Sequence, residues 1–438
     1  MTVSAVTAPE HHLPSLHVET SPLPSSVDDL AQLVALVDAR NPLFWQRRGE
    51  GLAGVGELLR LEFHGATRFA DAAAAWREIV QRATVIDPLR VPGSGLLAFG
   101  AFAFSALSAQ SSVLIVPELL VGKAGGQSWV TRVSIADAAG SSTVAPNRTA
   151  TSGHHPTAPA ARPFGPRFSV TLSPGSLDHD AYRALVAEAI DRINNHEVGK
   201  VVLARDLVGQ LPEGADLRRL LRELAAGYPD CWTYAVDGLV GSSPETLIRA
   251  HRGDLSARVL AGTISRGPDP ASDQAAAIAL ATSEKDNDEH EFAVQSLLAS
   301  LRPHATHVAA DEVPFTLKLP NLWHLATDIE GTLSDGSTSL DLIAALHPTA
   351  AVAGTPTTVA LALIDELEPF DRGRYAGPVG WVDAAGDGEW AIALRCAQID
   401  ELGGIRAYAG CGIVAESQPE QELAESRMKF RPIVEAFL

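Results

Sequence analysis

Residues 231–263 read CWTYAVDGLVGSSPETLIRAHRGDLSARVLAGT, and this stretch decides the fold class. Its aromatic and β-branched runs are separated by Asp237-Gly238 and Gly253-Asp254, pairs that are typical of tight turns between strands. The pattern therefore predicts a meander of antiparallel strands.

Further helices and strands surround the meander. Four segments are predicted helices: 69–83, 179–195, 216–227 and 286–302. Five segments are predicted strands: 200–209, 324–331, 379–383, 390–400 and 405–414, the last two forming a pair. Because helices and strands come in runs, an α+β fold with a large antiparallel sheet is favoured over a parallel α/β fold.

Composition restricts the class of protein. The chain has 438 residues, 46% of them hydrophobic, which is enough for a large core. The formal net charge of −19 disfavours nucleic acids and anionic membranes as partners, although a metal and a few cations could still bind a small anion. Three cysteines without CxxC spacing indicate a reducing cytoplasm. The uncharged segment 91–117 is interrupted by Gly, Ser and Gln, and it predicts two buried strands rather than a transmembrane helix.

The ends and the middle of the chain bear on domain organisation. Residues 1–25 are expected to be a flexible lead. They do not contain the basic segment followed by an apolar run that is typical of a signal peptide. Residues 138–166 are rich in Ala, Ser, Thr, Pro and Gly, which is typical of a loop or a linker. From its residues alone this segment could separate two domains or lie within one fold.

Two acidic helix faces point to a metal. In SQPEQELAESRMKF (417–430), Glu422, Glu425 and Lys429 recur at helical spacing, and Asp286 and Glu289 repeat the acidic pattern in SEKDNDEHEF (283–292). Such faces are usually solvated, but two of them suggest a divalent cation held between two helices. Lys429, one turn beyond Glu425, suggests that the small molecule bound to the metal is also an anion.

Ordered sequence blocks identify a resemblance to a known family. The blocks are GKVVLAR (199–205), SSPETL (242–247), VLAGTISRG (259–267), EKDNDEHEF (284–292), LWHLATDIEG (322–331), LHPTAAVAGTP (346–356), RYAGPVGW (374–381), GDGEWAIALRCA (386–397) and AGCGIVAESQPEQELAESRMK (409–429). In this order they resemble the chorismate-utilising enzymes over residues 168–438, while 26–167 is less diagnostic. The resemblance implies one α+β domain over 26–438, with helices around a large antiparallel sheet, the active site in a central cleft, and 138–166 as an internal loop.

The resemblance also implies catalytic roles. Lys200 would be the general base that activates water, although a lysine at the start of a strand is more often merely exposed. Glu245 would be the general acid, for which partial burial should raise the pKa; its alternative is a cap of a turn. Glu289, Glu425 and Glu422 would hold Mg²⁺, since oxygen ligands favour a hard cation over zinc. Asp286 would support them from a position one turn away.

Substrate contacts follow from the same blocks. The residues expected to bind or approach chorismate are Gly262, Thr263, His324, Gly354, Tyr375, Arg395, Gly410, Gly412 and Lys429. Arg395 and Lys429 suit carboxylates. A lone histidine such as His324 is more often a satisfied core residue, and Cys411 is expected to be a small buried residue rather than a nucleophile.

Two positions indicate the branch of the family. Ammonia-using members generally lack a lysine at the place of Lys200, and a nucleophilic lysine of aminodeoxychorismate synthases is replaced here by Ala261. The LHPTAAVAGTP block favours an isochorismate synthase, with a salicylate synthase as the alternative. A catalytically inactive Mg²⁺-binding relative is disfavoured because Lys200 and Glu245 are both present. We expect a monomer without a glutaminase subunit, whose product could serve menaquinone or siderophore synthesis.

Overall fold

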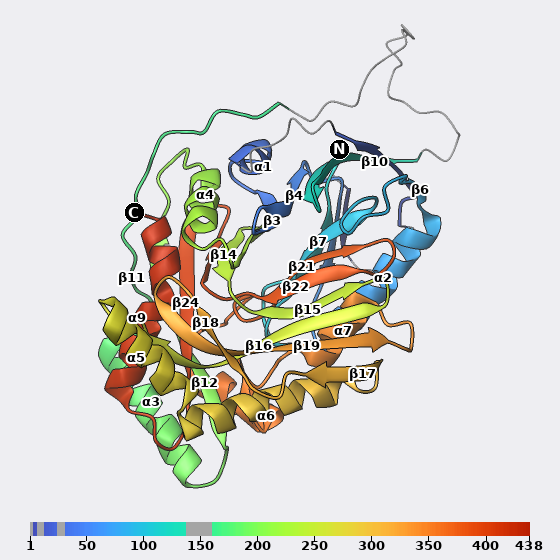
Figure 1. The fold of residues 1–438 in the computed structure, drawn as a ribbon. Helices are drawn as coiled ribbons and strands as arrows, with labels where there is room; N and C mark the ends of the chain where they lie inside the picture. Colours follow the sequence, from blue (N-terminus) through green and yellow to red (C-terminus); the bar gives the residue numbers. More distant parts are fainter. Residues whose placement is uncertain (1–2, 7–12, 24–30, 137–159) are drawn as a thin grey trace, which may run out of the picture.

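The computed structural model describes residues 3–6, 13–23, 31–136 and 160–438, and two large sheets dominate it (Figure 1). The first has eleven strands among the described residues, in the order β1 (Val3–Val6), β5 (Leu59–Phe63), β8 (Ser112–Val116), β7 (Leu97–Ala101), β21 (Pro378–Asp383), β22 (Gly388–Ile392), β15 (Thr246–His251), β16 (Asp254–Ser265), β19 (Leu322–Leu333) and β17 (Ala305–Ala310), with β18 (Phe315–Lys318) also on β19. Apart from the parallel pair β1–β5, neighbouring strands in it are antiparallel.

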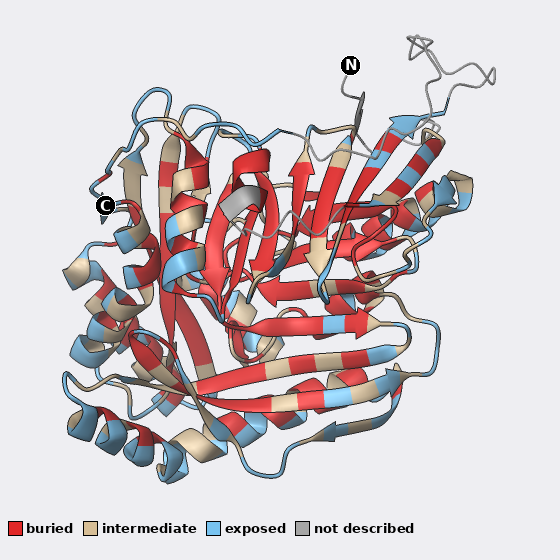
Figure 2. Ribbon diagram, turned by 45° about the horizontal axis from the view of Figure 1, so that its top comes forward, coloured by how far each residue is buried: buried red, intermediate tan, exposed pale blue. Residues whose placement is uncertain are grey.

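The second sheet has thirteen strands among the described residues. Their order is β11 (Ser173–Pro174), β12 (Lys200–Gln210), β24 (Gly404–Ile413), β23 (Cys396–Ile399), β14 (Leu239–Ser243), β13 (Trp232–Val236), β3 (Leu43–Arg47), β4 (Glu50–Val55), β9 (Leu119–Ala124), β10 (Gln127–Ile135), β2 (Leu16–Pro22) and β6 (Thr84–Ile86), with β20 (Gly354–Thr355) also on β12. One hydrophobic cluster joins the sheets, because it contains both Trp390 of β22 and Tyr234 of β13. Figure 2 shows the strands largely buried and the helices exposed on their outer faces.

Helices cover the outside of the sheets. They are α1 (Ala31–Leu36), α2 (Arg68–Arg82), α3 (His179–Asn194), α4 (Leu217–Gly227), α5 (Pro270–Ala281), α6 (Glu284–Leu301), α7 (Ser339–Leu346), α8 (Thr357–Leu367) and α9 (Pro419–Ala436). The helix α9 packs on β24 and α3, whereas α6 packs on β16 and β19. The two acidic segments thus lie on helices that belong to different sheets.

Local sequence accounts for the starts of these helices. The side chain of Asp178 accepts a hydrogen bond from the Ala181 N–H at 2.8 Å at the start of α3. Ser283 does the same for the Asp286 N–H at 3.2 Å, so α6 begins just before its acidic face. Pro419 occupies the first turn of α9, where its missing N–H costs nothing.

The predicted α+β fold is confirmed, as are the two strands within 91–117, which are β7 and β8. In the described part of the chain, none of the helices has the length and apolar character that a membrane span requires. All three cysteines are buried and free of disulfides.

Three predicted details need correction. The strand expected at 390–400 is divided: β22 belongs to the first sheet, and only β23 pairs with β24. The chain changes sheets between Ile392, the last residue of β22, and Cys396, the first of β23, and Arg395 in this crossing has a φ of 52°. The second meander turn is centred on Arg252-Gly253, one residue earlier than expected.

The third correction concerns the expected flexible lead at 1–25. Within it, β2 pairs along its length with β10 and also pairs with β6. Most residues of β2 alternate between buried and exposed, as expected for a strand with one face on the core. Most of the expected loop at 138–166 lies outside the described residues, and 160–166 form neither helix nor strand.

Candidate active site

A cavity of about 90 Å³ lies between the two sheets and collects many of the residues predicted to act on substrate. Seven predicted residues line it: Glu245, Thr263, His324, Tyr375, Arg395, Gly410 and Lys429. They come from both sheets, from the crossing at Arg395, and from α9. Residues far apart in sequence therefore meet in one central site.

Glu245 is a buried acid in this cavity, 6% exposed. Burial raises its pKa to about 8, although the positive charges of Arg395, Lys429 and Lys200 oppose the shift. Its backbone is held on both sides, since its N–H donates to Ser243 Oγ at 3.2 Å and its carbonyl accepts from the Ile392 N–H at 3.2 Å. At neutral pH the carboxyl is protonated, so Glu245 can donate a proton to a group in the cavity.

Two positively charged side chains line the same cavity as the Glu245 carboxyl. Arg395 is buried, and burial lowers the pKa of its guanidinium. Lys429 Nζ donates to the Gly410 carbonyl at 2.9 Å and lies 2.6 Å from a carboxylate oxygen of Glu425. A buried guanidinium and an ammonium on one cavity can bind a small dianion.

His324 is neutral and has one ring nitrogen available. Its Nδ1 lies 2.9 Å from Thr263 Oγ1, and its buried Nε2 has no hydrogen-bond partner among the described residues. Burial lowers its pKa to about 3. The strands meet here at an irregularity between Ala261 and Thr263, where Gly262 has a φ of 78°. Gly262 thus shapes the strand that carries Thr263 toward His324.

Lys200 and Glu289 lie next to the cavity rather than in its wall. The Lys200 ammonium forms an ion pair with Glu289 of α6. Gly412 leaves room for this lysine, because a Cβ there would lie 2.6 Å from Lys200 Cε. Gly354 does not line the cavity either: at φ 131° it packs on the Lys200 backbone, where a Cβ would lie 2.1 Å from the carbonyl oxygen. Both glycines therefore position Lys200.

The predicted metal ligands are only partly brought together. Glu422 and Glu425 of α9 and the Cys411 thiol offer ligand atoms within 4.8 Å of one another, whereas Glu289 is held by Lys200. Burial, and then the Glu425 charge, raise the pKa of Glu422. For Glu425, burial is the largest single influence and raises the pKa, but the charge and the hydrogen bond of Lys429, together with the charge of Arg395, outweigh it and lower the pKa. Two partly buried carboxylates held this close fit a hard cation.

The surroundings of Cys411 do not favour a reactive thiolate. Burial raises the pKa of its thiol well above the usual range, and its Sγ donates to the Glu422 carbonyl at 3.3 Å. Asp286 lies beside Gly262, where a Cβ on that glycine would be 3.3 Å from the Asp286 Cβ.

Sequence reasoning missed some of the cavity wall. Val202 and Tyr408 line it, and the Tyr408 ring stacks on Tyr375 with centroids 5.2 Å apart. Val202 is two residues after Lys200, and Tyr408 is two residues before Gly410, so strand periodicity could have placed each beside a predicted site residue. Ala351 and Val352 line it too, and their signal was their place in the LHPTAAVAGTP block, just before Gly354.

Comparisons with known proteins agree with this geometry. A family model described as chorismate binding enzyme matches residues 5–438. The isochorismate synthase DhbC of Bacillus subtilis is 42% identical over 267 residues, which cover 58% of this chain and 67% of that protein. The salicylate biosynthesis isochorismate synthase of Pseudomonas aeruginosa is 30% identical over 432 residues, which cover 94% of this chain and 88% of that protein.

A solved structure extends the likeness to the fold. The putative 2,3-dihydroxybenzoate-specific isochorismate synthase DhbC of Bacillus anthracis has a TM-score of 0.74 and 31% sequence identity. The match covers 93% of this chain and 99% of that one.

Proposed function

The chain belongs to the chorismate-binding enzyme family, and we propose that it is an isochorismate synthase that isomerises chorismate to isochorismate. The observation that carries this proposal is the buried, protonated Glu245 in a cavity lined by Arg395 and Lys429, with Lys200 close enough to affect its pKa. An acid, a base and an anion site in one place are what the isomerisation requires.

The residues divide the reaction between them. Lys200 accepts a proton from water, whose oxygen forms a bond to C2 of the ring. The two ring double bonds each move by one position, and the C4–O bond breaks with its electron pair. Glu245 gives its proton to the departing hydroxyl, which leaves as water. Arg395 and Lys429 hold the substrate carboxylates, and the free His324 Nε2 and Tyr375 orient the ring.

Glu289, Glu422 and Glu425 are the residues that would hold Mg²⁺. When bound, such an ion would neutralise a substrate carboxylate while keeping some of its waters. Glu289 has one carboxylate for two roles. If it bound a metal, the Lys200 ammonium would lose its carboxylate partner, and after releasing one proton to solvent its neutral amine could accept a proton from water. The three buried, unlinked cysteines suit a reducing compartment, so we expect the enzyme to act in the cytoplasm.

Incubation with chorismate and Mg²⁺, followed by chromatographic separation of the products, tests the function. We expect isochorismate as the only product. Salicylate together with pyruvate would instead support a salicylate synthase. An amino product that requires ammonia would contradict the proposed water chemistry.

A further inference from the structure

A cavity of about 250 Å³ adjoins the one proposed to bind chorismate. The first is called the rear cavity and the second the chorismate cavity. The walls of the rear cavity come mainly from α6, the end of α7 and residues 347–351. The two cavities have two lining residues in common, Glu245 and Ala351. Glu245 is therefore reached by both, although the isomerisation proposed above makes use of the chorismate cavity alone.

Small side chains create the space of the rear cavity. Six of its lining residues are alanine or serine: Ala293, Ser296, Ser300, Ala345, Ala350 and Ala351. The first three recur at a spacing of three and four residues, so they lie on one face of α6, a helix that packs against α7. The volume is enough for several waters, since each water takes about 30 Å³ in the liquid.

Two polar atoms of the residues in this wall lack a partner. His347 Nδ1 and Thr349 Oγ1 are buried, and neither has a hydrogen-bond partner in the part of the chain that the structure describes. His347 Nε2 lies 3.1 Å from the Phe104 carbonyl, and a carbonyl only accepts, so Nε2 carries the ring hydrogen and Nδ1 is an acceptor. Burial lowers the pKa of His347 to about 3, which keeps the ring neutral. An acceptor and a hydroxyl in a cavity of this size are suited to bind water.

The proposed reaction leaves Glu245 one proton short. Its carboxylate must regain a proton before the next turnover, while Lys200 must lose one to solvent. Glu245 is 6% exposed, and a ligand in the chorismate cavity would close that side to water. On the other side, Ser296 and Ser300 of α6 are half-buried, so the rear cavity approaches the protein surface there.

We propose that the rear cavity holds a chain of waters that carries protons from solvent to Glu245. The water next to the carboxylate gives it a proton as one O–H bond breaks, and that water receives a proton from the following one. The chain takes up one proton from solvent per turnover, the number that Lys200 releases, so charge is balanced. His347 and Thr349 are positioning residues that hold the waters. The proton transfer rests on the proposed function, whereas the binding of water does not.

A high-resolution crystal structure of the full-length wild-type protein tests the binding of water. We expect ordered water within hydrogen-bond distance of His347 Nδ1 and Thr349 Oγ1, and a cavity without density for water would overturn the proposal. Thr349→Val keeps the shape and removes the hydroxyl. Its urea midpoint should fall below that of the wild type, because hydrogen bonds to water are lost. An unchanged or raised midpoint would mean that the hydroxyl is buried without water, and it would overturn the site.

Blocking the rear cavity tests the proton transfer. Ser296→Leu should lower kcat at least about threefold and raise the midpoint of the basic limb of kcat/KM by at least about half a pH unit, because the Glu245 carboxylate loses the waters that solvate its charge. Thr349→Val should move the limb in the same direction. The charges of Arg395, Lys429 and Lys200, which also act on Glu245, are the same in these variants.

The matched control is Ala299→Leu, which adds similar bulk on the exposed face of the same helix and should keep both values. A disturbed α6 alone would lower activity without moving the limb. A limb that stays in place in Ser296→Leu and Thr349→Val would therefore overturn the proton route and leave isochorismate synthesis intact. If the wild type failed to convert chorismate, the proposed function and the proton route would fall together, and the crystal structure would still decide whether the cavity binds water.

Discussion

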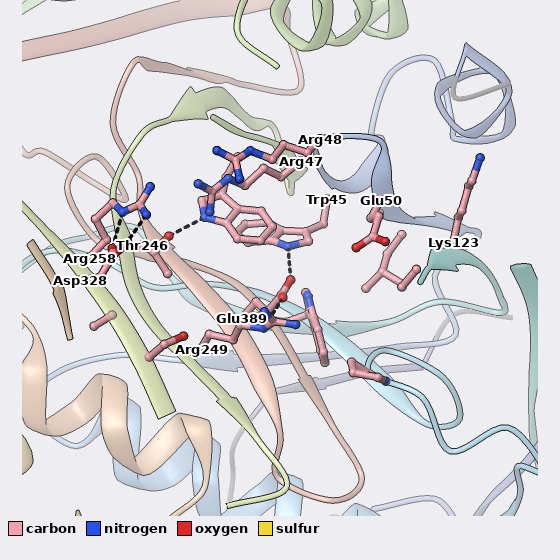
Figure 3. A pocket seen from close by; sticks show the side chains of 18 of the residues that line it. Trp45, Arg47, Arg48, Glu50, Lys123, Thr246, Arg249, Arg258, Asp328 and Glu389 are labelled. Carbon is pink, nitrogen blue, oxygen red and sulfur yellow. Dashed lines mark hydrogen bonds and ion pairs between the residues drawn. The ribbon is translucent and has the colours of Figure 1, made fainter. Parts of the chain in front are cut away.

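Two cavities lie between the same two sheets, yet their charged groups are arranged in opposite ways. One is the chorismate cavity around Glu245, and the other is a cavity of about 400 Å³, the tryptophan cavity, lined by Trp45, Trp129, Trp232 and Trp381 (Figure 3). In the first, burial raises the pKa of Glu245 to about 8, and although the charges of Arg395 and Lys429 oppose the shift, no described residue forms an ion pair with its carboxyl. In the second, Arg258 and Arg249 each meet a carboxylate directly. The difference teaches that a carboxyl buried without an ion-pair partner stays protonated and can donate a proton. A carboxylate paired closely with an arginine stays ionised instead.

Removing the proton donor gives the largest expected effect. Glu245→Gln should lower kcat by about 10²–10⁴-fold, because the amide keeps the shape but cannot protonate the leaving hydroxyl. Steady-state kinetics with chorismate measure it. The control is Asp383→Asn, a buried carboxyl outside both cavities whose pKa burial raises to about 7. If Asp383→Asn lost as much activity as Glu245→Gln, burial alone rather than the site would explain the effect.

The proposed base should come next. Lys200→Ala should lose kcat by about 10²–10⁴-fold while chorismate still binds, since Arg395 and Lys429 remain. Single-turnover kinetics separate binding from chemistry. The exposed Lys285 on α6 offers a control, and Lys285→Ala should turn over normally. Normal turnover by Lys200→Ala would remove the base from the mechanism.

The metal ligands should have a smaller and more specific effect. Glu289→Gln and Glu425→Gln should each raise the Mg²⁺ concentration needed for half-maximal activity by at least about tenfold, in the range seen when metal environments are disturbed. Calorimetric titration of Mg²⁺ checks the same change without turnover. Glu420→Gln, exposed at the start of α9, should leave both values unaltered. Metal-independent activity in either variant would rule out the two-helix metal site.

The pH profile of kcat/KM, which reports groups of the free enzyme, should have a basic limb set by Glu245. The carboxyl donates only when protonated, so its contribution to kcat/KM should fall about tenfold per pH unit above its pKa of about 8. Rates from pH 6 to 10 at chorismate concentrations well below KM, with saturating Mg²⁺, measure the limb. The residual activity of Glu245→Gln should lack it, and an identical limb in that variant would assign the titration to another group.

Stability should show the same raised pKa of Glu245 without substrate or metal. Burial raises the pKa of Glu245 from 4.5 to about 8, so the folded protein binds the extra proton and loses stability as pH rises between these values. The loss is at most about 5 kcal/mol from a shift of this size. Urea unfolding at pH 5 and pH 8 should therefore show a smaller difference for Glu245→Gln than for wild type. Equal differences in the two proteins would contradict a buried, protonated Glu245.

Much of the fold could be predicted from sequence because its elements are marked locally. The turn at Asp237-Gly238 and the cap at Asp178 announce their elements within a few residues. The division of 390–400 between two sheets could not be predicted, because only the second half pairs with the neighbouring β24, while the first half pairs with β15, far away in the chain.

The candidate site divides in the same way. Glu245, Arg395 and Lys429 could be predicted from motifs, and the cavity contains all three. The ion pair of Lys200 with Glu289 joins residues 89 positions apart and follows from packing rather than from pattern. The tryptophan cavity had no signal in sequence, since Trp45 and Glu389 meet only through the packing of two sheets.

The sheet crossing at Arg395 has a mechanical consequence. Its left-handed backbone lets three residues carry the chain from β22 to β23, so its guanidinium follows the relative placement of the two layers. A small molecule bound by both Arg395 and Lys429 of α9 would therefore hold the two sheets in a fixed relative position. A sliding movement of one sheet over the other would separate these two cations and weaken binding before it changed either sheet.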